Sequence, residues 1–248
     1  MRASRSVSIS DTARRGGIRI ANNQAVPQAR CALLVVILVT ILPSPAWAQD
    51  PATPPQDTPP DRIFGVLPNF GTVENGADVP PITTARRFRI ASLSTFDPFV
   101  YPFVALTAGI ADLRGQEPAW SGGSGYMKHY AVAFTDNAVG NMFTTAIVST
   151  LADQDPRYFV LGTGGFWRRA AYAASRSVVT RRRDRLQFNV SELGGNAAAA
   201  ALSNLYYPAP NRSLAATLDR WQTQVMWDTL SNELKEFWPD LRQALLHR

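Results

Sequence analysis

The segment from Gly125 to Leu151 contains no proline, and no charged residue follows Asp136 within it. At helical spacing its apolar side chains surround the axis, and its polar side chains are nearly all small and uncharged. The pattern predicts a helix about 40 Å long. A helix without a wet face is normally enclosed by protein or by lipid, so we expect other helices to pack around this segment.

Apolar periodicity and local end signals predict further helices on both sides of this segment. Asp97 followed by Pro98 is a typical helix start. Asn189 is a second one, with Glu192 three residues later in the capping-box position. A break is expected at Pro239, before a short terminal helix. The other predicted helices cover residues 85–93, 97–113, 166–183, 191–206 and 211–238.

No segment shows convincing strand alternation, and glycine and proline occupy the connections. We therefore expect an all-α fold, a single helical bundle of five or six helices around the long apolar central helix. An irregular arm over residues 62–81 precedes the bundle. Its apolar residues are spaced by glycine and proline, and we allow for one short strand within it.

Residues 1–48 have the organisation of an export signal. Several arginines precede the apolar run Cys31–Leu42, and Ala46–Ala48 has the small-residue pattern of a cleavage site. The apolar run is about 12 residues long, against roughly 20 for a membrane span, so we expect a cleaved signal peptide rather than an anchor. The proline-rich residues 49–61 are expected to form a disordered linker, and residues 62–248 a helical domain.

Removal of the signal peptide changes the charge balance. The chain carries 25 basic and 19 acidic residues, of which six arginines and one aspartate lie in residues 1–48. The remainder is nearly neutral, so the high pI is no argument for nucleic-acid binding. Cys31 is the only cysteine, and His129 and His247 are the only histidines. We therefore expect no thiolate nucleophile, no metal site and no cofactor.

Lys128, His129 and Asp136 form the first candidate site. His129 and Asp136 are seven residues apart, two turns along one helix face. There a carboxylate would orient an imidazole and raise its pKa for general-base catalysis. The structural alternative places Lys128 and His129 at the wet end of the helix. Asp136 is then a buried acceptor, bonded to Asn137, Asn141 or an arginine.

Asp153 and Asp155, close to Arg157, form the second candidate site, with Glu192 as a third carboxylate. Hydrolases use paired carboxylates as general acid and general base. The alternative is structural, because an Asp-x-Asp-Pro sequence at the end of a helix is common in turns.

Seven arginines and only one acidic residue occur between positions 168 and 185. At helical spacing Arg169, Arg176 and Arg183 share one face, and Arg168 flanks it. With two aromatic residues at its start, this helix suits an anionic membrane surface or a phosphate-bearing lipid, since guanidinium binds phosphate bidentately. The alternative is that these arginines pair internally with acidic side chains.

Several short motifs after the linker resemble those of a family of bacterial exported proteins. The resemblance rests on Arg62–Asn69, Gly125–Tyr130, Gln154–Phe159, Phe188–Glu192, Ser203–Pro208 and Glu236–Asp240. It covers most of residues 62–248 and implies membership of that family. It implies no activity or ligand, because none is assigned to the family.

Together these observations predict an exported protein of the bacterial cell envelope, in the periplasm or associated with a membrane. We expect it to be non-catalytic and to contact a membrane surface or an anionic envelope lipid through apolar helices and the arginines at 168, 169, 176 and 183. Two alternatives stay open. One is an envelope hydrolase using His129 with Asp136, or the carboxylates of residues 153, 155 and 192. The other is an integral membrane protein spanned by residues 130–151, with Asp136 costly there unless paired.

Overall fold

The computed structural model describes residues 62–74, 79–120, 124–182 and 185–246. Of the described residues 66% are helical, which confirms the predicted helical class. The signal peptide and the linker lie outside the described residues, so they stay predictions.

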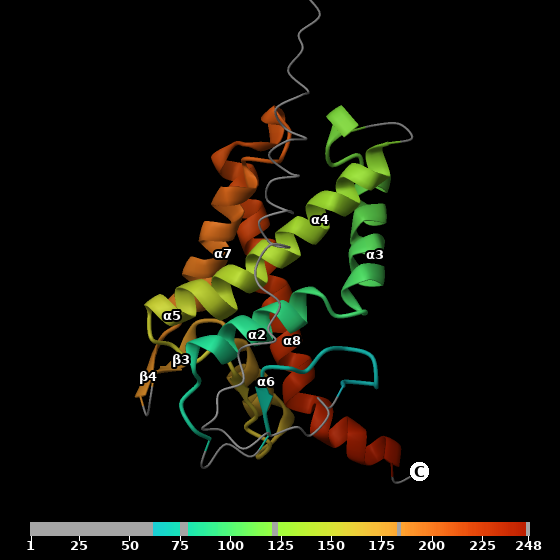
Figure 1. Cartoon of the computed structure of the whole chain (residues 1–248). Helices are drawn as coiled ribbons and strands as arrows, with labels where there is room; N and C mark the ends of the chain where they lie inside the picture. The colour runs from blue at the N-terminus through green and yellow to red at the C-terminus, as the bar shows by residue number, and fades with distance from the viewer. Residues whose placement is uncertain (1–61, 75–78, 121–123, 183–184, 247–248) are drawn as a thin grey trace, which may run out of the picture.

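Helices of very different length make up most of the domain (Figure 1). The α-helices are α2 (Thr84–Thr95), α3 (Val100–Leu113), α4 (Gly125–Asn141), α5 (Ser149–Leu151), α6 (Phe166–Ser175), α7 (Val190–Ser203) and α8 (Leu214–Leu246). Two 3₁₀ turns, η2 (Pro118–Trp120) and η4 (Ala209–Asn211), precede α4 and α8. Between α4 and α5 the backbone stays helical in π geometry, as η3 (Met142–Val148), so residues 125–151 form one uninterrupted helical segment.

This segment crosses the molecule between the other helices (Figure 1). α3 packs against α4, α2 and α7 pack against η3, and α8 packs against both α6 and α7. α7 approaches this segment closely at Gly195, where a β-carbon would lie 2.8 Å from Thr144 Cα. Among the described residues no single helix has the length and apolar character of a membrane span. α2 and α3 reach them only as a pair, bent by 57°.

Two helix starts follow from local chemistry. The side chain of Thr83 accepts a hydrogen bond from Arg86 N, ahead of α2. Asn189 Oδ1 accepts from Glu192 N at 3.0 Å, ahead of α7. The Glu192 side chain does not complete the predicted capping box, because Asn189 N donates instead to Val178 O at 2.7 Å. The Glu192 carboxyl group is therefore free to point elsewhere.

An ion pair and a short parallel sheet tie residues 62–74 to the helices. Arg62 Nη2 lies 2.6 Å from Oδ2 of Asp97, whose side chain is almost fully buried. Asp97 also accepts from Phe99 N at 2.9 Å, just before α3. Further along, β1 (Thr72–Val73) pairs in parallel with β2 (Tyr158–Phe159).

Residues 176–182 do not continue a helix, so the prediction of one helix over 166–183 is wrong. α6 ends at Ser175, and β3 (Val179–Arg182) pairs with β4 (Arg185–Phe188) as an antiparallel hairpin. The three β-branched residues 178–180 favour an extended backbone, because branching at the β-carbon restricts the side chain in a helix.

The predicted break at Pro239 is also wrong, since α8 continues through it. Proline removes one helical hydrogen bond and disfavours helix at the residue before it. Here the side chains on both sides are held from α6. Arg169 Nε donates to Glu236 Oε1 at 2.9 Å, and Arg169 Nη1 donates to Asp240. These tertiary contacts stabilise a continuous helix across the proline.

Candidate functional site

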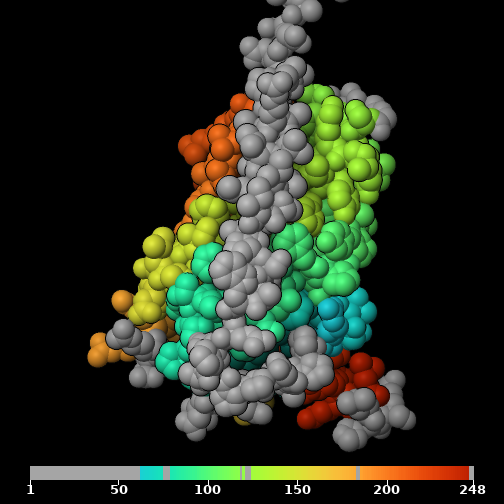
Figure 2. All heavy atoms as spheres, viewed as in Figure 1, coloured from blue at the N-terminus to red at the C-terminus, as the bar shows by residue number. Residues whose placement is uncertain are grey.

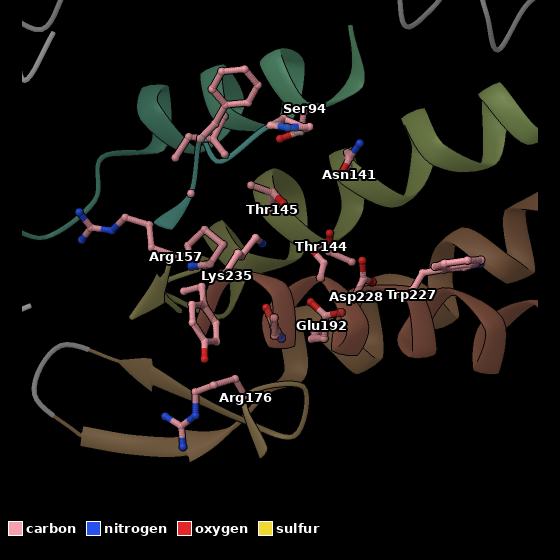
Figure 3. A pocket seen from close by; sticks show the side chains of 18 of the residues that line it. Ser94, Asn141, Thr144, Thr145, Arg157, Arg176, Glu192, Trp227, Asp228 and Lys235 are labelled. Atoms are coloured by element: carbon pink, nitrogen blue, oxygen red, sulfur yellow. The ribbon is translucent and has the colours of Figure 1, made fainter. Parts of the chain in front are cut away.

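A cavity of about 390 Å³ lies between α2, η3, α7, α8 and the short strands. Its apolar wall includes Ile63, Phe70, Ile90, Phe99, Phe103 and Trp227. Its polar wall includes Asn141, Thr144, Thr145, Glu192, Asp228 and Lys235 (Figure 3). Sites for small molecules have this size and this mixture of apolar walls with a few convergent polar groups.

Asn196 holds two carboxyl groups from different helices together at this wall. Its Nδ2 donates to Glu192 Oε1 at 3.2 Å and to Asp228 Oδ2 at 2.9 Å. Glu192 and Asn196 share a face of α7 because they are four residues apart, and Asp228 comes from α8. Asn196 is only 1% exposed, so its amide has no water to replace these partners.

The contact between the two carboxyl groups favours the protonated form of Glu192. Burial raises the pKa of Glu192 well above its ordinary value, and the charge of Asp228 and a hydrogen bond with it raise the pKa further. Lys235 and Asn196 act in the opposite direction. Ionising Glu192 is costly here, because its charge would lie close to a second carboxyl group.

Lys235 supplies the positive charge of the group. It is seven residues after Asp228 and lies on the same face of α8. Burial lowers the pKa of Lys235, while the charges of Asp228 and Glu192 raise it. Figure 3 shows the three side chains around one space, next to Thr144 and Thr145. The two threonines come from η3. π geometry is rare in proteins, and where it does occur it is often at a functional site.

Asp155 also lines the cavity, but Arg157 neutralises it. Arg157 Nε lies 3.0 Å from Asp155 Oδ1 and Arg157 Nη2 lies 2.7 Å from Oδ2, and Nη2 also donates to Pro80 O. The guanidinium groups of Arg157 and Arg176 point away from Glu192 (Figure 3). The structure thus brings Asp155 and Glu192 to one cavity, with Asp155 in a structural ion pair.

Asp153 lies apart from this cavity, in a left-handed backbone conformation with φ of 52°. Its Oδ2 is 3.5 Å from Arg182 Nε, and both side chains are exposed. The predicted carboxylates therefore do not form one cleft. Asp153 belongs to the connection between α5 and β2.

His129 and Asp136 point to different partners, although both lie on α4. His129 is buried rather than at a wet helix end, and its ring centroid is 5.2 Å from that of Trp120. His129 Nδ1 is 2.9 Å from Glu117 Oε2. Burial lowers the pKa of His129, which Asp112 partly offsets. The predicted imidazole–carboxylate pair is therefore not formed.

Asp136 is a half-buried acceptor, and its donors differ from those of the structural alternative. The hydroxyl groups of Tyr206 and Tyr207 donate to its two carboxylate oxygens. Burial raises the pKa of Asp136 to about 6, against the effect of both hydrogen bonds and of Arg220. The two tyrosines lie 70 and 71 residues from Asp136 in sequence, and no local pattern indicates this contact.

Arg169, a predicted lipid-binding residue, is buried against α8. Its main partner is Glu236, which is 0% exposed. Glu236 also accepts from Tyr158 Oη at 2.8 Å, Leu161 N at 2.9 Å and Gly162 N at 3.0 Å. A carboxylate with this many donors fixes the position of α8, α6 and the chain after β2.

The predicted lipid-binding role of Arg169 therefore needs correction, because this side chain faces the protein interior. The Arg176 guanidinium lies over the Tyr172 ring at 4.6 Å, while the alanines at 171 and 174 are exposed. Arg168 is exposed. Arg183 lies outside the described residues. Internal pairing, the alternative given above, describes Arg169, but with Glu236 and Asp240 as partners.

Sequence reasoning missed Asp228, Lys235 and Asn196. A signal for Asp228 and Lys235 was their spacing, because seven residues place two charged groups on one face of an otherwise amphipathic helix. Asn196 gave a weaker signal, as a polar side chain among alanines. Comparison with family models, with curated proteins and with solved structures finds no match. The resemblance to a family of exported proteins therefore stays a prediction.

Proposed function

We propose that this chain is an exported cell-envelope protein whose helical domain binds a small amphipathic molecule in the cavity beside Glu192, Asp228 and Lys235. Export rests on the sequence pattern of residues 1–48. In this proposal the helices form one bundle around residues 125–151, and η3 contributes a wall of the cavity. The bound molecule would place its polar end at the charged group and its apolar part against Phe103 and Trp227.

One observation carries the proposal: Asn196 joins two carboxyl groups at the wall of a cavity, with Lys235 beside them. Buried charges that serve only the fold are normally paired with opposite charges and leave no cavity beside them, as where Arg169 meets Glu236 and Asp240. Here two acidic groups and one amine meet beside a space of about 390 Å³. Such a group offers both a donor and an acceptor to a ligand that excludes water.

Calorimetric titration of the full chain with octylamine, octanoate and octanol tests this proposal. The three probes share one apolar chain and differ in the charge of the polar end. We expect saturable binding of at least one probe, changed about tenfold or more by Glu192→Gln, because a contact with a buried charged group contributes roughly 1.5–3 kcal/mol. Arg114→Gln, on the exposed end of α3, is the matched control. No binding of any probe would overturn the proposal.

A second candidate function is hydrolysis, which the proximity of the Glu192 and Asp228 carboxyl groups favours. In such a pair the ionised carboxylate takes a proton from the attacking water, and the protonated group donates one to the leaving group. This version replaces Asp136 and Asp153 of the predicted hydrolase by Asp228. It expects turnover of a nitrophenyl ester or phosphate that Glu192→Gln and Asp228→Asn both abolish. Turnover that survives either substitution would exclude it.

A further inference from the structure

The β3–β4 hairpin exposes large apolar side chains beside arginines. Leu186 and Phe188 of β4 are 62% and 58% exposed, and Leu151, at the end of α5, is 81% exposed. Arg182 and Arg185 are also exposed and lie directly opposite each other in the register of the hairpin. We call Leu151, Arg182, Arg185, Leu186 and Phe188 the hairpin edge.

The residues of the hairpin edge lie at one side of the molecule, with Arg182 and Arg185 on one face of the hairpin and Leu186 and Phe188 on the other. Asp155 and Arg181 form a backbone bridge between the chain after α5 and β3, and Gln154 Nε2 donates to Phe188 O at 2.7 Å. Figure 1 places α5 and both strands at the same side of the molecule. In Figure 2 the yellow end of this helical segment and the orange hairpin meet at the left margin.

The hairpin edge carries an excess of positive charge. Like charges directly opposite each other in a hairpin destabilise it. Arg182 is partly compensated by Asp153, at 3.5 Å and exposed. For Arg185 no ion pair occurs among the described residues. An anionic surface placed against both guanidinium groups would remove their repulsion.

We propose that the hairpin edge docks on the surface of an anionic phospholipid bilayer. With the hairpin edge-on to the bilayer, Arg182 and Arg185 would pair with lipid phosphates on one face of the hairpin, and Leu186 and Phe188 on the other face, with Leu151, would enter the boundary between headgroups and acyl chains. Free phosphate or a nucleic acid would use the arginines but leave the apolar side chains in water. This contact is independent of the cavity, and it moves the membrane contact from α6 to the hairpin.

Flotation of the full chain with vesicles tests the proposal. The vesicles contain phosphatidylcholine alone or with added phosphatidylglycerol. Two double variants remove one half of the surface each, Arg182→Gln with Arg185→Gln and Leu186→Ser with Phe188→Ser. Leu113→Ser with Arg114→Gln is the matched control, because Leu113 is 89% exposed at the far end of α3. All variants keep residues 1–61, so any membrane contact made by that part is constant.

We expect binding to the anionic vesicles that weakens with salt. The double variant Arg182→Gln with Arg185→Gln should have a partition coefficient about tenfold to thirtyfold below that of the wild type, since each basic residue near such a surface contributes about 1 kcal/mol. The double variant Leu186→Ser with Phe188→Ser should also have a lower partition coefficient, and the control variant should not. Thermal melts must show that each variant is folded.

Three results would overturn the proposal. The first is equal flotation of wild type and both hairpin variants. The second is an absence of flotation by the wild type. The third is a wild-type dimer, detected by light scattering, that is absent in both hairpin variants and does not depend on lipid. That result would make a second copy of this chain the occupant of the hairpin edge.

Discussion

Arg169 and Glu236 neutralise each other in the interior, where α6 packs against α8. Arg169 Nε donates to Glu236 Oε1 at 2.9 Å, and the two side chains are 8% and 0% exposed. Arg169 Nη2 also donates to Glu236 O, so one side chain holds both the carboxylate and the backbone of α8. The pair therefore sets how the last helix lies on the rest of the domain.

We expect Arg169→Ala to lower the free energy of unfolding by about 3–5 kcal/mol, because it leaves a buried carboxylate without its counter-charge. Arg168→Ala is the control, since Arg168 is the exposed neighbour on the same turn. Its effect should stay within about 0.5 kcal/mol. Urea denaturation measures both, and equal losses from the two variants would contradict the assignment.

Gly195 and Gly194 should respond to alanine in opposite directions. A β-carbon at Gly195 would lie 2.8 Å from Thr144 Cα, whereas one at Gly194 would meet only Val190 Cγ1 at 3.5 Å. Gly195→Ala should therefore destabilise the protein by about 1–3 kcal/mol through overpacking. Gly194→Ala should stabilise it by up to about 1 kcal/mol, because alanine is the better helix former. Thermal melts of the two variants give the comparison, and a shared sign would refute it.

The raised pKa of Asp136, about 6, makes a pH-dependent contribution to stability. The folded protein holds this proton more tightly than the unfolded chain, whose aspartate has a pKa of about 3.9. This contribution is therefore complete below about pH 4 and is lost as the pH rises through about 6. Relative to Asp136→Asn, the wild type should lose stability over that window. Parallel stability curves of the two proteins would show that Asp136 titrates normally.

Substitutions of Asn196 test the carboxyl pair at the cavity. Asn196→Leu removes both donors that hold Glu192 and Asp228, and should lower the free energy of unfolding by about 2–4 kcal/mol. Asn196→Asp puts a third carboxyl group against the pair. Its loss of stability should be larger at neutral pH than near pH 4, since protonation removes the repulsion. A loss independent of pH would mean that the three groups do not interact. Urea denaturation at two pH values supplies the measurement.

Local chemistry made part of the fold predictable from the sequence. The start of α7 depends on Asn189 and its neighbour three residues on, and the prediction holds because the contact is local. The hairpin escaped prediction because arginine and alanine favour helix around it, which masked the three β-branched residues at 178–180. The course of α8 through Pro239 depends on Arg169, 67 residues before its partner, and no local pattern contains that information.

The candidate site was predictable to a smaller extent. Glu192 is one of the carboxylates that the sequence predicts for the site, and it lines the cavity together with Asp155. Its closest partner, Asp228, lies on another helix, and only the packing of α7 on α8 brings the two together. The opposite error occurred at His129 and Asp136, where helical spacing suggested contact. The two side chains lie two turns apart on one helix face, but each contacts a residue of another element instead.

The π geometry of residues 142–148 sets how much change this segment can accept. A π turn accommodates a residue more than an α turn does, so η3 is equivalent to an α-helix that has taken up an insertion. Deleting one residue there would restore α geometry and leave the faces of α4 and α5 close to their present relative orientation. Deleting one residue from the regular α-helix between Asp136 and η3 would instead rotate everything before it by about 100°, and the face of α4 that carries Asp136 would leave its tyrosines while η3 stayed on α7. A change in length is therefore tolerated better in the π turn than in α4, where it would be more harmful than most changes of residue.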